Sequence, residues 1–141
     1  MPIPQSEGLK ILVADDFASM RRIVKHALNS VGFHDVTLAE GGSAALDLLQ
    51  REPFDCLITE SQIDGLDLVR TLRADPRLQS LRVLMISAET QRQQIIEAMQ
   101  AGVDGYLVKP FTAAALKARI ERVMESVPEA EAAKRTVRGP S

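Results

Sequence analysis

KILVADD, residues 10–16, is an apolar run that ends abruptly in two carboxylates, and this pattern indicates the fold of the whole chain. The run is too short for a helix and rich in branched residues, which is typical of a strand buried on both faces. Similar short runs return at 36–39, 54–59, 82–86 and 106–108. We therefore predict five strands, each leaving the core where its apolar run ends.

The segments between these runs carry apolar residues at three- and four-residue spacing, which predicts helices. We expect Ser43, Thr90 and Thr112 to cap the starts of three of them, and Gly32 and Gly102 to end two others. Strands that alternate with helices must run parallel, with right-handed crossovers. The predicted fold class is α/β, a doubly wound five-stranded parallel sheet flanked by five helices.

Composition limits the function. The chain has 141 residues, 45% hydrophobic and 26% charged, which suits one globular domain. A net charge of -2 argues against nucleic acid as a partner, and no apolar run reaches the roughly 18 residues that cross a bilayer. We find no signal peptide, and the single Cys56 fits a buried thiol in a reducing compartment, so we expect a cytoplasmic protein. We expect one domain over 8–126, with disordered ends at 1–7 and 127–141.

Four of the five predicted strands end in residues that could form a site: Asp15 and Asp16, then Glu60, Ser87 and Lys109. Ligands of such sheets bind beyond the carboxyl ends of the strands, where these residues gather. Two carboxylates about 5 Å apart repel by roughly 3 kcal/mol at an effective dielectric of 20, so three of them favour a cation such as Mg²⁺. The alternative is a set of solvated loop residues with the lysine in a salt bridge.

Residues 8–126 resemble the receiver domains of two-component response regulators, and chemotaxis regulators in particular. The resemblance rests on four stretches in this order: 12-LVADDFASMRR-22, 54-FDCLIT-59, 83-VLMISAE-89 and 101-AGVDGYLVKPF-111. It implies a flavodoxin-like fold with strand order 2-1-3-4-5.

The resemblance also implies a magnesium site. Asp15 and Asp16 correspond to the acidic pair that holds Mg²⁺, with Asp16 as the direct ligand. The side chain at position 60 and the backbone carbonyl of Gln62 would complete the ligands from the protein.

The resemblance further implies a switch. Ser87 and Lys109 take the places of the hydroxyl and the lysine that contact the phosphoryl group, and Lys109–Pro110 would be a cis peptide. Tyr106 matches the aromatic residue that turns inward when Ser87 moves.

Two residues of the site depart from the family pattern. The phosphoacceptor of the family is an aspartate, whereas this chain has Glu60, and its next loop reads Ile63-Asp64-Gly65 instead of Met-Pro-Gly. One extra methylene moves the carboxylate by about 1.5 Å, and errors near 1 Å can cost about 10²-fold in rate. We therefore predict that Glu60 accepts phosphate poorly or not at all. The residue fits a natural, phosphorylation-independent receiver and also an engineered phosphomimetic. In either case the pocket would bind Mg²⁺ weakly, or Glu60 would pair with Lys109 and bias the switch.

The resemblance places the output on the surface made by the fourth helix, fifth strand and fifth helix. A histidine kinase or a flagellar motor switch protein would be the partner of this monomeric, non-enzymatic module. An alternative is a receiver that still autophosphorylates and dephosphorylates with Mg²⁺ in a phosphorelay. A hydrolase is disfavoured, because His26 and His34 lie at no strand end. Candidate contact residues on the output surface are Gln91, Arg92, Ile95, Tyr106 and Lys117.

Overall fold

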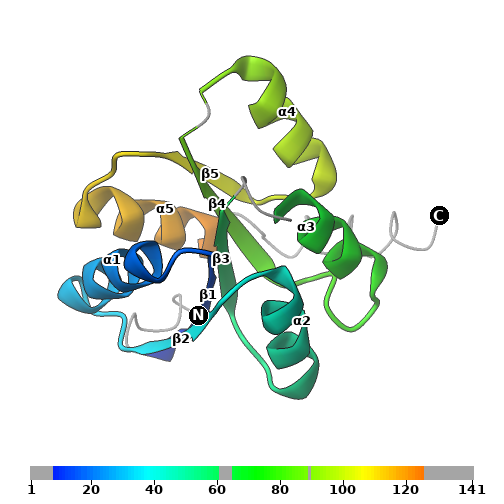
Figure 1. The fold of residues 1–141 in the computed structure, drawn as a ribbon, viewed down its shortest axis with the longest axis horizontal. Coiled ribbons are helices and arrows are strands. Elements are labelled where there is room, and N and C mark those ends of the chain that lie inside the picture. Colours follow the sequence, from blue (N-terminus) through cyan, green and yellow to red (C-terminus); the bar gives the residue numbers. More distant parts are fainter. Residues whose placement is uncertain (1–7, 61–64, 89, 126–141) are drawn as a thin grey trace.

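A computed structural model describes residues 8–60, 65–88 and 90–125 of the chain (Figure 1). Strands and helices alternate through these ranges, as predicted. The expectations for 1–7, Gln62, Ile63, Asp64 and 127–141 lie outside the described residues. The elements are β1 (Lys10–Ala14), α1 (Ala18–Ser30), β2 (Asp35–Ala39), α2 (Gly42–Arg51), β3 (Cys56–Glu60), α3 (Gly65–Ala74), β4 (Arg82–Ser87), α4 (Arg92–Ala101), β5 (Gly105–Val108) and α5 (Ala113–Glu125).

All strand pairs are parallel, and the sheet order is β2-β1-β3-β4-β5, which confirms the predicted fold class. The register brings the carboxyl ends of the strands to one edge. Ala14 pairs with Thr59, Glu60 pairs with Ile86, and Ser87 pairs with Val108. The polar residues at and just beyond these ends are thereby held near one another.

Side chains of successive strand residues alternate between two apolar layers. Ile11 and Val13 belong to the layer covered by α1 and α5, whereas Leu12 and Ala14 belong to the layer covered by α2, α3 and α4. Figure 1 shows the two helical layers on opposite sides of the sheet. Burial on both faces explains why the strands read as continuous apolar runs.

The predicted helix caps are correct at one of three places. The Thr112 hydroxyl accepts a hydrogen bond of 3.0 Å from the backbone N–H three residues later and so caps α5. Ser43 lies inside α2, whose N-cap is Gly41, and Thr90 precedes Gln91, the N-cap of α4. Neither of these N-caps makes a side-chain hydrogen bond, so a hydroxyl near a helix start was an unreliable guide here.

The predicted helix ends are closer to the structure. Gly102 is the C-cap of α4 with a φ of 114°, in the left-handed region that glycine favours. α1 ends one residue earlier than expected, at Ser30, and Gly32 follows with a φ of 104°. β3 begins at Cys56 instead of residue 54, and just before it the Asp55 carboxylate accepts a hydrogen bond of 2.8 Å from the Lys10 N–H.

Arg73 connects the end of α3 to the residues that follow α4 and to those that precede β4. The Arg73 guanidinium, at the end of α3, forms a salt bridge of 2.9 Å with Asp104, whose side chain is 2% exposed. Its N–H groups also donate to three backbone carbonyls, those of Gln79, Leu81 and Gly102. This network joins the end of α4 to the start of β4. No helix within the described ranges is long and apolar enough to cross a membrane.

Candidate functional site

Glu60 and Lys109 form an ion pair at the carboxyl edge of the sheet. Lys109 Nζ donates to Glu60 Oε2, from the residue after β5 to the last residue of β3. The Glu60 side chain is only 3% exposed and that of Lys109 is 23% exposed. The Glu60 side chain therefore contacts Lys109 directly, which confirms the predicted Glu60–Lys109 pair.

Asp15 lies next to this pair and is also buried. Its Oδ1 atom accepts a hydrogen bond of 2.9 Å from the backbone N–H of Phe17, which holds the carboxylate in the turn before α1. Burial raises the pKa of Asp15 above its ordinary value. The N–H of Phe17 opposes this shift, the negative charge of Glu60 adds to it, and the positive charge of Lys109 weakly offsets it. The site is thus a place where negative charge is poorly solvated.

Asp16 faces solvent at the rim of the same edge. A Cβ atom built on Gly41 would lie 3.1 Å from Asp16 Oδ1, so the small residue at position 41 leaves room for this carboxylate. Nothing in the sequence around Gly41 indicates this contact. Only the packing of the turn after β2 against that after β1 makes it part of the site.

Two further residues were missed from the sequence. Arg21 Nη1 donates to the backbone oxygen of Asp15 at 2.7 Å and so steadies the acidic turn from α1. Thr59 is 1% exposed, and its hydroxyl oxygen has no hydrogen-bond partner in the structure. Both residues stand in stretches that carry the family resemblance, but neither the Arg21 contact nor the burial of the Thr59 hydroxyl has a signature in residue spacing.

The switch residues lie where the strand ends place them. Ser87 is fully buried, and its backbone oxygen accepts from the Lys109 N–H at 2.9 Å. Tyr106 is half-buried in β5, opposite Met85 of β4. The Lys109–Pro110 peptide is cis, as the resemblance implied. The inward turn of Tyr106 stays a prediction.

The metal prediction is met only in part by the geometry. Among the residues that the structure describes, no three or more histidine, cysteine, aspartate or glutamate side chains are grouped so that they could hold a metal ion. The described side chains of Asp15, Asp16 and Glu60 are thus not grouped as a metal site, Glu60 is paired with Lys109, and the magnesium site stays a prediction. Asp15 and Asp16 remain adjacent hard oxygen donors of the kind that suits Mg²⁺.

The proposed output surface is partly open to solvent. Gln91 and Arg92 are exposed at the start of α4, whereas Ile95, Tyr106 and Lys117 are half-buried. Figure 1 shows α4 standing out from the sheet beside β5. His26 and His34 are both exposed, on and just after α1, and neither lies at a strand end, as expected.

Comparison with known proteins shows which family the chain belongs to. Residues 11–121 match the family model described as the response regulator receiver domain. The chain belongs to this family. It is 51% identical over 122 residues to the chemotaxis protein CheY of Pseudomonas aeruginosa, covering 84% of this chain and 98% of that protein. It is 48% identical over 123 residues to the chemotaxis protein CheY-3 of Vibrio cholerae serotype O1, covering 85% of this chain and 95% of that one.

Solved structures agree with the fold. The chemotaxis response regulator CheY4 of Vibrio cholerae superimposes with a TM-score of 0.75 at 31% identity, covering 82% of this chain and 98% of that chain. This protein is therefore a receiver domain of two-component signalling, similar to chemotaxis response regulators.

Proposed function

We propose that this receiver signals through protein contacts from a state set by the Glu60–Lys109 ion pair instead of by phosphorylation. The observation that carries the proposal is the pair itself, buried at the position where the family has its phosphoacceptor. The Glu60 carboxylate contacts Lys109, the residue that in the family contacts the phosphoryl group. The pocket then holds a permanent anion–lysine contact.

The same contact disfavours phosphoryl transfer. The reaction needs a carboxylate oxygen placed in line with the phosphorus and a positive charge on the transferring oxygens. Here the carboxylate is longer than aspartate by one methylene, and the nearest lysine already neutralises it. Both requirements are weakened by the one residue at position 60.

Asp15 and Asp16 are the residues that would hold Mg²⁺. When bound, the ion would supply positive charge to phosphoryl oxygens. Asp15 is buried beside Glu60, and the positive charge of Lys109 acts on both carboxylates. We expect Mg²⁺ binding to be weak, because Glu60 is already paired.

The output is a protein contact on the surface formed by α4, β5 and α5. Exposed Gln91 and Arg92 and the half-buried Tyr106 offer that contact polar and aromatic groups. The relatives are named chemotaxis proteins, which supports a motor switch protein or a histidine kinase as the partner of a monomeric, cytoplasmic regulator.

Incubation with a small phosphodonor and Mg²⁺, followed by intact-mass spectrometry, tests the proposal. We expect no phosphoryl adduct on the unaltered chain or on the Glu60→Gln control, and a base-labile adduct on Glu60→Asp. A stoichiometric adduct on Glu60 itself would overturn the proposal. If Glu60→Asp also fails to label, then residue 60 is not the only obstacle to transfer.

Tyr106 provides a second reading of the same experiment. It is the single tyrosine of a chain without tryptophan, so tyrosine fluorescence reports on this position alone. We expect the phosphodonor to change the emission and its quenching by acrylamide in Glu60→Asp, and to leave both unchanged in the unaltered chain.

A further inference from the structure

All five N–H groups of the Arg73 guanidinium have an acceptor in the structure. Nη1 donates to the backbone carbonyls of Gln79 and Leu81 at 2.9 and 2.7 Å. Nε and Nη2 donate to the carbonyl of Gly102 at 3.0 and 2.7 Å, and Nη2 also donates to Asp104 Oδ2 at 2.9 Å. Because the Arg73 side chain is only 17% exposed, it holds the residues that follow α4 from inside the domain.

The backbone at Gly102 is suited to this contact. Its φ is 114°, which glycine adopts more readily than other residues. A Cβ atom built on Gly102 would lie 2.7 Å from Arg73 Cγ, so the arginine side chain fills the space beside the glycine. Asp104 extends the contact into the sheet, because its Oδ2 atom also accepts a hydrogen bond of 2.8 Å from the Val83 N–H in β4. The C-terminal end of α4 is therefore fixed to both α3 and β4.

The rest of α4 is held less firmly. Of its ten residues, all of which the structure describes, only Ala98 is buried, and Ile96 and Met99 are 36% and 47% exposed. Within the described part of the chain, the N-cap Gln91 makes no side-chain hydrogen bond to the start of the helix. Figure 1 shows α4 projecting beyond the sheet. The first turns of α4 thus depend on restraint at the other end of the helix.

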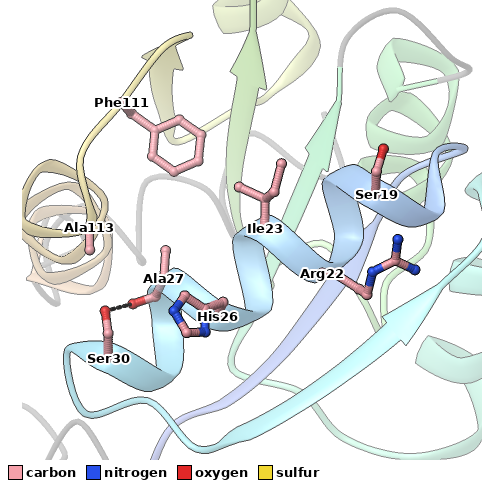
Figure 2. A pocket seen from close by; sticks show the side chains of 8 residues that line it. All are labelled: Ser19, Arg22, Ile23, His26, Ala27, Ser30, Phe111 and Ala113. Atoms are coloured by element: carbon pink, nitrogen blue, oxygen red, sulfur yellow. Dashed lines mark hydrogen bonds between the residues drawn. The ribbon is translucent and has the colours of Figure 1, made fainter.

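α1 provides a comparison on the opposite face of the sheet. It also leaves a large apolar side chain open, since Ile23 is 53% exposed and faces Phe111 across a groove between α1 and the start of α5 (Figure 2). However, α1 buries both Val24 and Leu28, which hold it by packing along its length. The one buried side chain of the fully described α4 is an alanine, which removes much less apolar area from water than valine or leucine.

We propose that Arg73 is the positioning residue of the output surface: it fixes the C-terminal end of α4, and the helix pivots about Gly102. This inference rests on the proposed output surface, because Gln91 and Arg92 lie at the start of α4, far from Arg73. Ten residues of helix from Arg92 to Gly102 span about 15 Å, so a rotation of about 10° at Gly102 moves the first turn by about 3 Å.

Hydrogen–deuterium exchange with peptide mass spectrometry measures the restraint on each helix without a partner or a phosphodonor. We expect Arg73→Lys to raise the exchange rate of the α4 amides at least about tenfold, and that of the α1 amides several-fold less. Lysine keeps a positive charge opposite Asp104 but lacks the planar fork that donates to three carbonyls. A tenfold rise corresponds to about 1.4 kcal/mol, the contribution of one or two hydrogen bonds.

Val24→Ala is the matched control, because Val24 is buried in α1 in the apolar layer on the other face of the sheet. It should raise exchange more in α1 than in α4. Gly102→Ala is an independent variant that strains φ and displaces the Arg73 side chain, so it should reproduce the selective rise in α4.

The same ratio of α4 to α1 exchange in Arg73→Lys and Val24→Ala would overturn the proposal, since the arginine would then act only on global stability. Unchanged exchange of α4 in Gly102→Ala would also overturn it. Neither result bears on the phosphodonor test of Glu60, so a failure of the positioning role is distinguishable from a failure of the proposed function.

Discussion

Lys109→Met should destabilise the domain more than Glu60→Gln, because the two partners of the ion pair are buried to different depths. The Glu60 side chain is 3% exposed and that of Lys109 is 23% exposed. Removing the lysine charge leaves a buried carboxylate without its counter-charge. Removing the glutamate charge leaves an ammonium group that can turn towards water, and it also relieves repulsion with Asp15.

The size of each loss follows from this geometry. Two unit charges about 3 Å apart attract by roughly 5 kcal/mol at an effective dielectric of 20, and removing one partner of a buried pair costs about 3–5 kcal/mol. Because Lys109 is partly exposed, we expect the lower end, about 3 kcal/mol for Lys109→Met and about 1 kcal/mol or less for Glu60→Gln. The double variant should lose about 2 kcal/mol less than the sum of the single losses.

Urea unfolding followed by circular dichroism in metal-free buffer measures these differences. Lys117→Met is the matched control, since Lys117 is half-buried on α5 and forms no ion pair with the described residues; we expect its loss to stay within about 0.5 kcal/mol. Equal losses in the two single variants, or a double variant whose loss is the sum of the single losses, would contradict this role of the ion pair.

Three more outcomes follow from buried contacts outside the pair. Arg73→Met should lower the free energy of unfolding by about 3 kcal/mol, because Asp104 loses its ion-pair partner and three backbone carbonyls lose a donor, while the Val83 N–H still donates to Asp104; urea unfolding that shifts by less than a third of this would contradict the role. Gly105→Ala should lower the free energy of unfolding by about 1–3 kcal/mol, since its Cβ would lie 2.5 Å from Val123 Cγ2. Thermal unfolding measures this loss, and an unchanged midpoint would show that α5 can shift to accommodate the methyl group. Burial raises the pKa of Cys56 from 9.0 to about 12, so iodoacetamide should label it at pH 8 only in denaturant, and rapid labelling of the folded chain would be inconsistent with that burial. Because the folded-state pKa of Cys56 is the higher one, its contribution to stability is present below pH 9.0 and is lost as the pH rises towards about 12.

Much of the fold could be predicted because its signals are local. Apolar runs such as Ile11 to Ala14 and the three- and four-residue spacing between them depend only on neighbours in the sequence. The expectations that failed concern contacts instead. Ser43 and Thr90 have the side chains of N-caps, but the packing of each helix decides where its first turn begins, and that turn starts without them.

In the site, too, the residues at the strand ends could be predicted from the sequence, whereas the contacts around them could not. Arg21 and Gly41 act on the acidic turn through contacts that no spacing rule describes, and the sequence offered no sign of them. The magnesium site of the three carboxylates stays a prediction. The structure adds that Glu60 pairs with Lys109, because a charge interacts most strongly with the opposite charge that lies nearest in space.

Residue patterns alone are enough to predict the alternation of strands and helices, the edge at which Asp15, Glu60, Ser87 and Lys109 collect, and the glutamate at the phosphoacceptor position. The pairing of Glu60 with Lys109, 49 residues away, comes from the folded sheet, in which β4 lies between β3 and β5. The physical reason is that an ion pair depends on separation and burial, which are set by the packing of the whole sheet. Residue types alone leave the choice between a metal, a phosphoryl group and a lysine open.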